Sequence, residues 1–183
     1  MPQTLRWAGV TSLTALSHIG ENWPQRLFDE ALRFYPVTAG QTCQSAVCHR
    51  ITFMYSELYR HEQLDDDTHQ ALHEIFGVAN IRAFEHLATM VNAGHLVAFD
   101  GRDVYMPHLR RLALPIAFIH GEKNHCFLPE STQLTLDELA SANGAALYQR
   151  HVVPGYGHID CIFGKNAVND VYPLMLEHLE ATK

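Results

Sequence analysis

The feature that most constrains the fold is a strand, loop and helix pattern that occurs twice in the second half of the chain. Residues 114–120 (LPIAFIH) form a continuous apolar run, and residues 147–153 form a second short run rich in β-branched and aromatic side chains. Both runs end at turn-forming residues and therefore predict buried strands. A helix is predicted after each strand, from a cap at Ser131 to Gly144 and over residues 166–182.

A histidine lies in the turn that follows the second predicted strand. His158 is flanked by Gly155 and Gly157, which let the backbone bend tightly beside the imidazole. Two strands joined through a helix predict a parallel pair whose loops open at the same edge of the sheet. The loop over residues 122–130 is therefore expected to face the loop that carries His158. Open α/β sheets carry their catalytic and ligand-binding residues at this edge.

The first half of the chain is predicted to be helical, because apolar residues recur there at helical spacing. The expected helices cover residues 23–35 after a cap at Asn22, residues 46–59 after Ser45, residues 68–76 and residues 80–93. Gly77 and Gly94 are expected to end the last two helices. A brief extended piece is expected over residues 95–99.

Taken together, these segments resemble a known family. The motifs PIAFIHGEKN and PGYGHIDCIFGKNAVNDVYPLMLEHLE look like the carboxy-terminal end of an α/β hydrolase of the acid-lipase branch. The sequence from Trp23 onward resembles a hydrolase-like region of some bacterial proteins. The segments that carry this resemblance are RLFDEALRFYPV, CHRITFMYSELYRHEQL and ALHEIFGVANIRAFEHLATMV. In those proteins this region is fused behind the flavin part of glucose-methanol-choline oxidoreductases, often labelled cholesterol oxidase.

The resemblance implies an α/β fold, namely the carboxy-terminal half of an α/β hydrolase and helix-rich overall. Residues 1–20 are expected to be a lead-in segment, and residues 21–112 a helical, cap-like block over the active-site mouth. Residues 113–183 would then supply the last two parallel strands with their helices. All three parts are expected to belong to one compact domain.

The resemblance also implies the site residues. His158 stands at the position of the general base, and Asn124 stands where the family pattern Gly-x-x-Asp has the acid. An asparagine can accept a hydrogen bond from His158 but supplies no charge, so Glu122 is the alternative acid. Asp160 is expected to be structural and to bind backbone amides of the histidine turn.

The expected parent activity is hydrolysis of a carboxylic ester of a lipid or sterol, linked to an FAD-dependent alcohol or sterol oxidation outside these residues. The sequence lacks the Gly-x-Ser-x-Gly elbow that carries the nucleophile, so the chain is expected to start after it and to be inactive alone. No cofactor is expected in this chain, because FAD would belong to a fused parent. The alternative is a non-catalytic binding or interaction module.

Two partners are expected from the sequence. One is a small-molecule ester or lipid, and the other is a strand that pairs with an exposed edge of the predicted sheet. The edge of the strand over residues 114–120 would expose unpaired amides, so it is expected to pair with another copy, with residues 1–20 or with the parent protein. A net charge of -7 without a Lys/Arg cluster argues against nucleic acid and anionic membranes. Neither a signal peptide nor a bilayer-spanning apolar run is visible, which favours a cytoplasmic protein.

The sequence contains two partial metal motifs, and neither is complete. His69 and His73 are four residues apart beside Glu74, and Cys43 and Cys48 lie next to His49. The histidines are interpreted as solvated and the cysteines as small buried hydrophobes, so no metal site is expected. Four scattered cysteines, including Cys126 and Cys161, predict reduced thiols rather than a disulfide framework.

Overall fold

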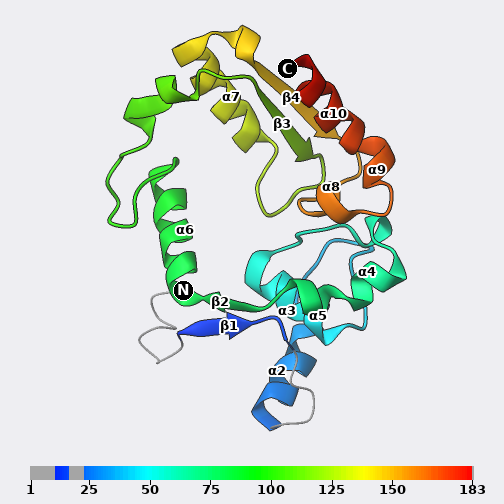
Figure 1. Ribbon diagram of the computed structural model, residues 1–183. Coiled ribbons are helices and arrows are strands. Elements are labelled where there is room, and N and C mark those ends of the chain that lie inside the picture. The colour runs from blue at the N-terminus through cyan, green and yellow to red at the C-terminus, as the bar shows by residue number, and fades with distance from the viewer. Residues whose placement is uncertain (1–10, 17–22, 183) are drawn as a thin grey trace.

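Two small sheets and a series of helices make up residues 11–16 and 23–182, the part of the chain that the computed structural model describes (Figure 1). The larger sheet pairs β3 (Ile116–Gly121) with β4 (Tyr148–Val153) in parallel, with Ile116 opposite Tyr148 and Gly121 opposite Val153. Both predicted strands and their parallel pairing are confirmed. The chain is thus a mixed α/β protein.

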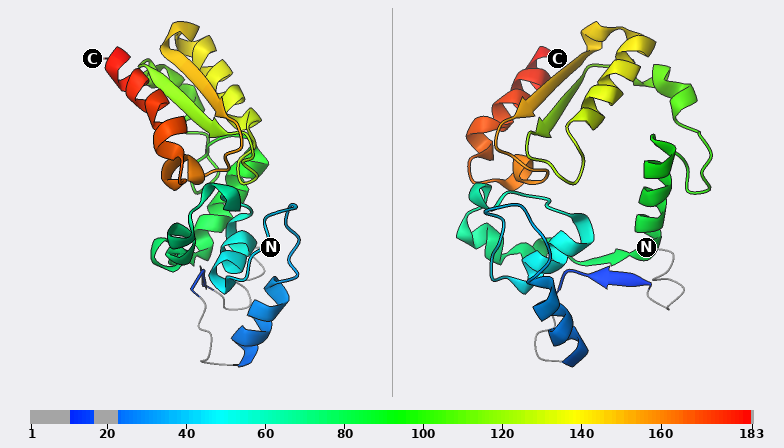
Figure 2. Two further views of the ribbon diagram at one scale, coloured as in Figure 1. Left: turned by 90° about the vertical axis from the view of Figure 1, so that its right-hand side faces the viewer. Right: turned by 180° about the vertical axis from the view of Figure 1, so that it is seen from behind.

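Helices cover both faces of this sheet. Helix α7 (Glu130–Asn143) connects the strands and packs against them from one side, and α10 (Tyr172–Ala181) packs against β3 from the other (Figure 2, left view). Two short helices, α8 (Asp160–Phe163) and α9 (Ala167–Asp170), lead from β4 into α10. The loops after β3 and β4 therefore open at one end of a helix-covered sheet.

The first half of the described chain is mainly helical, as expected. Its helices are α2 (Trp23–Leu32), α3 (Ala46–Tyr55), the 3-10 turn η1 (His61–Gln63), α4 (Asp66–Gln70), α5 (Leu72–Ile75) and α6 (Ile81–Ala93). Ser45 caps α3 by accepting a hydrogen bond from the Cys48 amide, and Gly94 ends α6 at φ 73°. None of the helices described is long and apolar enough to cross a bilayer.

Several boundaries differ from the prediction for physical reasons. Asp65 caps α4, which starts before Thr68, and the helix expected over residues 68–76 breaks at Ala71. Helix α7 begins at Glu130 behind Pro129, not at a Ser131 cap. The helix expected over residues 166–182 is interrupted at Val171, because Pro173 lacks an amide hydrogen and fits only a first helical turn.

Two further expectations concern short extended segments. Residues 95–99 form no strand, because hydrogen bonds from Ala98 to Arg102 and from Gly101 to Ala98 close a turn instead. Most of residues 1–20, together with the Asn22 cap, lies outside the described residues. Within that segment β1 (Ser12–Thr14) pairs antiparallel with β2 (Val78–Asn80), not with β3. Covering of the β3 edge by another strand therefore stays a prediction.

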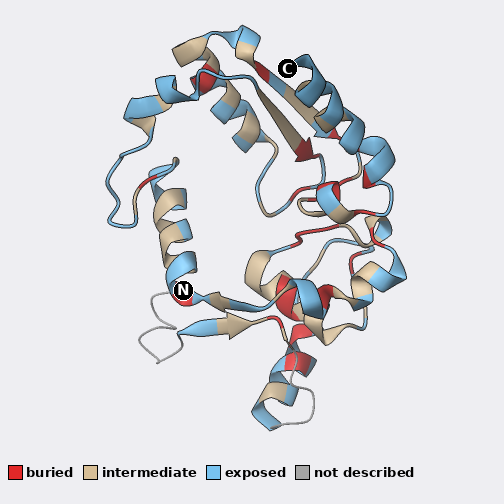
Figure 3. Ribbon diagram, viewed as in Figure 1, coloured by how far each residue is buried: buried red, intermediate tan, exposed pale blue. Residues whose placement is uncertain are grey.

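Many of the buried side chains belong to one of two clusters, and Figure 3 shows where buried residues lie along the chain. One lies within the helical block and consists of Ala15, Cys48, Ile51, Leu58, Tyr59, Leu64 and Leu72. The other lies between the parallel sheet and the carboxy-terminal helices and consists of Val153, Tyr156, Cys161, Ala167 and Val171. The Leu58 carbonyl accepts the amides of His158 and Ile159, both at 2.9 Å, so the helical block contacts the histidine loop.

The η2 segment (Met106–Leu112) leads from the helical block to β3. It packs against α7, and the Leu112 carbonyl accepts a hydrogen bond from the Tyr148 hydroxyl at 2.8 Å. The same hydroxyl accepts one from the Asn143 side chain. These bonds fix the end of the sheet opposite to the histidine loop.

Candidate functional site

The loops after β3 and β4 interlock at one edge of the sheet. The Glu122 amide donates to the Val153 carbonyl at 2.9 Å, and the Lys123 amide donates to the Tyr156 carbonyl at 2.7 Å. Gly121 lies so close to the second loop that a Cβ atom on it would clash with the Gly157 carbonyl oxygen. The two loops therefore face each other, as the crossover pattern predicted, and position 121 has no room for a side chain.

This interlocking brings together His158 and Asn124. The Nδ1 atom of His158 lies 3.1 Å from Nδ2 of Asn124, whose side chain is buried. The Asn124 Oδ1 atom accepts hydrogen bonds from the amides of Cys126 at 3.0 Å and Phe127 at 2.9 Å. Because those two donors require an oxygen, the amide nitrogen must be the atom that faces the imidazole.

The direction of this hydrogen bond is the reverse of the expected one. Asn124 donates to Nδ1 of His158, so Nδ1 is unprotonated and the neutral ring carries its proton on Nε2. In a catalytic triad the acid accepts from Nδ1–H and leaves Nε2 free to take a proton. Asn124 is therefore correctly placed for the acid of a triad but imposes the opposite tautomer on His158.

The surroundings of His158 also favour its neutral form. Its ring is half-buried and lies 5.1 Å, centroid to centroid, from the ring of Phe127. Burial lowers the pKa of His158, and the nearby His120 lowers it further. At neutral pH the side chain is therefore an uncharged ring held by a donor on one side.

The other two predicted polar residues fasten the loops. The Glu122 carboxylate accepts a hydrogen bond from the Gly155 amide at 3.2 Å and lies 3.5 Å from the Lys123 ammonium group. Asp160 is fully buried, and its carboxylate accepts the amides of Gly157 at 2.9 Å and Arg60 at 3.2 Å. The structural role predicted for Asp160 is thus confirmed, and its bond to Arg60 ties the histidine loop to the helical block.

A second group of reactive side chains lies inside the helical block. The Cys–His cluster consists of Cys43, Cys48, His61 and His69, whose potential ligand atoms all lie within 4.8 Å of one another. Cys48 is fully buried and the other three are half-buried. Cysteine sulfur and histidine nitrogen are the atoms that bind zinc in proteins, so these residues could hold a metal ion.

This cluster corrects the interpretation of the partial metal motifs. His73 is exposed, as expected, and its Nδ1 lies 2.8 Å from the Gln70 carbonyl oxygen. His69 is not a solvated residue, because its Nε2 is buried. His61 was not considered from the sequence, although the spacing Cys-x4-Cys-x12-His-x7-His departs from a zinc-finger pattern only in its last interval.

Comparison with known proteins gives no family assignment. Searches with the chain found no matching protein-family model, no matching curated protein and no matching solved structure.

Proposed function

We propose that the chain is a non-catalytic module that keeps the histidine loop of an α/β-hydrolase-like fold, with His158 as a fixed hydrogen-bond donor. The observation that carries the proposal is the direction of the hydrogen bond between Asn124 and His158. Ester hydrolysis through this histidine would need Nε2 as the acceptor of the nucleophile's proton. With the proton on Nε2, the ring can bind an ester, ketone or hydroxyl oxygen of a ligand but cannot act as a general base.

The positions of the serines give further support. The sequence has no Gly-x-Ser-x-Gly motif, and none of the serines in the described part of the chain lies on a turn from a strand into a helix. Ser56 is the single described residue other than glycine with a positive φ, 70°, a strained conformation. It ends helix α3, however, and so lacks the setting of a nucleophile elbow.

Hydrolysis of a lipid or sterol ester is the second candidate, and the placement of residues 124 and 158 favours it. They follow neighbouring parallel strands and touch at the sheet edge, as the acid and histidine of a hydrolase triad do. In this case the nucleophile would come from polypeptide outside these residues. A flavin-dependent oxidation would likewise belong to a fused parent protein.

The deciding experiment measures cleavage of a short nitrophenyl ester by the protein with all of its natural flanking sequence. We expect no turnover that depends on His158, so wild type, His158→Ala and the control His73→Ala should release nitrophenol at the same background rate. His73 is an exposed histidine and serves as a matched control. Turnover that disappears only in His158→Ala would overturn the non-catalytic proposal and establish the ester hydrolase.

A second readout is independent of the substrate. Nitrogen NMR of His158 should show a proton on Nε2 and none on Nδ1 in the neutral ring. A proton on Nδ1 would mean that Asn124 accepts rather than donates, and the argument for a non-catalytic histidine would fail.

A further inference from the structure

Four potential metal ligands from four segments converge in the helical block. Cys43 comes from the loop before α3, Cys48 from the first turn of α3, His61 from η1 and His69 from α4. In tetrahedral zinc sites with bonds of about 2.3 Å to sulfur and about 2.0 to 2.1 Å to nitrogen, ligand atoms lie about 3.3 to 3.8 Å apart. Cys48 Sγ and His61 Nε2 are already 3.3 Å apart, and the remaining pairs lie within 4.8 Å, so they would have to approach by at most about 1.5 Å.

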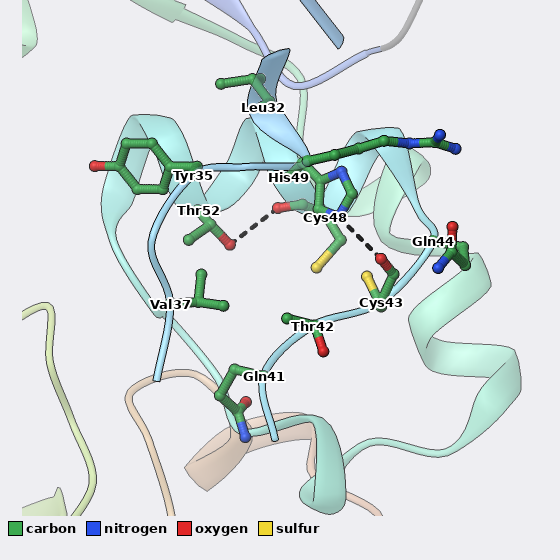
Figure 4. Close-up of a pocket in the computed structure, with 11 residues that line it drawn as sticks. Leu32, Tyr35, Val37, Gln41, Thr42, Cys43, Gln44, Cys48, His49 and Thr52 are labelled. Atoms are coloured by element: carbon green, nitrogen blue, oxygen red, sulfur yellow. Dashed lines mark hydrogen bonds between the residues drawn. The ribbon is translucent and has the colours of Figure 1, made fainter. Parts of the chain in front are cut away.

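The two sulfur atoms face the same interior space. Cys43 and Cys48 both line a pocket between the loop over residues 36–45 and helix α3, and their sulfur atoms point into it (Figure 4). The Tyr59 hydroxyl donates a hydrogen bond to Cys48 Sγ at 3.0 Å. This donor would stay in place for a thiolate at Cys48, the form of cysteine that binds metal.

The histidine ring of His61 is held in the tautomer that a metal requires. Gln41 Oε1 lies 3.1 Å from His61 Nδ1 and accepts the His61 amide at 2.9 Å. Gln41 Nε2 donates to the Glu62 carboxylate at 2.9 Å, which fixes the amide so that its oxygen faces the ring. The proton of His61 is therefore on Nδ1, and the Nε2 lone pair points at Cys48 and the cluster.

His69 supplies the remaining nitrogen. Its ring lies 5.1 Å, centroid to centroid, from that of His61. Its Nε2 atom is buried and has no hydrogen-bond partner among the described residues. Buried polar atoms in native proteins are rarely unpaired, and a bound ion is one of the causes.

We propose that the Cys–His cluster binds one zinc ion and that this ion is structural. Two thiolates balance the charge of Zn²⁺, so the bound site is neutral, which suits a buried position. Four protein ligands complete a tetrahedron and leave no position for a water molecule or substrate. On binding, the cysteines release their thiol protons to solvent.

The site joins four segments of the helical block. It would bind the loop over residues 36–45, helix α3, the η1 turn and helix α4 at one point. The role of the zinc ion is therefore to hold the helical block together. This role is independent of the function proposed for His158.

The test begins with the wild-type protein in its natural full-length form. After reconstitution with zinc and removal of excess metal, elemental analysis should give one zinc per chain. Cobalt in place of zinc should give the absorption of a tetrahedral site with sulfur ligands. Zinc should also protect the half-buried Cys43 from alkylation by iodoacetamide, while the labelling of the half-buried Cys126 should be the same with and without metal.

Variants assign the ligands. His69→Ala is expected to lower the affinity for zinc by more than about 100-fold, because even partners that only orient a ligand are worth about 10- to 100-fold. Cys43→Ser should abolish cysteine-to-cobalt charge transfer from that sulfur, and the controls His73→Ala and Cys126→Ser should bind zinc as wild type does. If a ligand variant does not fold, the alkylation experiment on wild type decides.

Three outcomes would overturn the proposal. They are substoichiometric zinc after reconstitution, an affinity for zinc that is unchanged in His69→Ala, and a Cys43–Cys48 disulfide in protein prepared under reducing conditions.

Discussion

Two buried amide side chains set two histidines in opposite tautomers. Gln41 turns its oxygen to Nδ1 of His61 and leaves Nε2 as an acceptor, whereas Asn124 turns its nitrogen to Nδ1 of His158 and leaves the proton on Nε2. In each case a further bond fixes the amide, to Glu62 for Gln41 and from two backbone amides for Asn124. Which histidine can bind a metal or accept a proton is thus decided by a neighbouring residue.

Replacing Asn124 by aspartate should reverse the setting of His158. The new carboxylate would still accept the amides of Cys126 and Phe127, and its second oxygen would accept a proton from Nδ1 of His158. An adjacent negative charge favours the imidazolium, so the pKa of His158 should rise by about 1 to 3 units from its lowered value. NMR titration of the imidazole measures it. The exposed Asn92→Asp, which makes the same charge change, should leave the pKa of His158 as it is, and an unchanged pKa in Asn124→Asp would contradict the geometry.

Gln41→Ala tests the corresponding interaction at His61. Loss of the amide oxygen frees the ring to rotate and to change tautomer, so zinc affinity should fall about 10- to 100-fold without loss of stoichiometry. Competition with a chromophoric chelator gives the affinity. Gln44→Ala is the matched control, because Gln44 is an exposed residue of the same loop. Equal affinities for the two variants would show that Gln41 does not position the ligand.

At the scale of helices and strands, local signals predicted most of the fold. Ser45 and Gly94 act as a cap and a stop, and the apolar run over residues 114–120 contains β3. Such signals depend on a few adjacent residues, so they can be read from the sequence. Helix α7 starts before the predicted Ser131 cap because the fixed φ of Pro129 already suits a helix start, which places Ser131 inside the first turn.

The candidate sites were less predictable, because their chemistry depends on contacts between distant residues. The pairing of residues 124 and 158 followed from the crossover pattern, but the direction of their hydrogen bond depends on the backbone amides that Asn124 also binds. The sequence alone does not reveal the Cys–His cluster, because its ligands belong to two incomplete motifs in separate segments and to His61, which lies in neither. Its completion depends on the path of the chain after Tyr59, which brings His61 back to Cys48.

The cap of α3 gives a prediction at this scale. Ser45→Ala removes the side-chain acceptor of the Cys48 amide, 3.2 Å away, and should lower the free energy of unfolding by about 1 kcal/mol. Urea denaturation of the zinc-loaded protein measures the change. Ser141→Ala replaces an exposed serine within α7 and should leave stability unchanged or slightly raise it, since alanine favours helix interiors. A loss of similar size in both variants would mean that the cap itself contributes nothing.

At the scale of the whole molecule, the segment over residues 57–63 links the helical block to the histidine loop. The Leu58 carbonyl accepts two amides of the histidine loop, the Arg60 amide donates to Asp160, and the Glu57 carboxylate lies 3.3 Å from Nδ1 of His125. His61, a ligand of the proposed zinc site, follows directly. The order of the histidine loop should therefore depend on the order of the helical block.

Removal of zinc tests this dependence. A chelator should release η1 from α3, loosen residues 57–60, and weaken the hydrogen bonds that the amides of His158 and Ile159 make to Leu58. Hydrogen–deuterium exchange of these two amides should become faster, while exchange in β3 and β4 should stay the same, because the strands pair with each other. His69→Ala should show the faster exchange without chelator and no further change when chelator is added. If zinc leaves and the amides of His158 and Ile159 stay protected, the histidine loop is ordered by its own sheet, and the helical block does not control it.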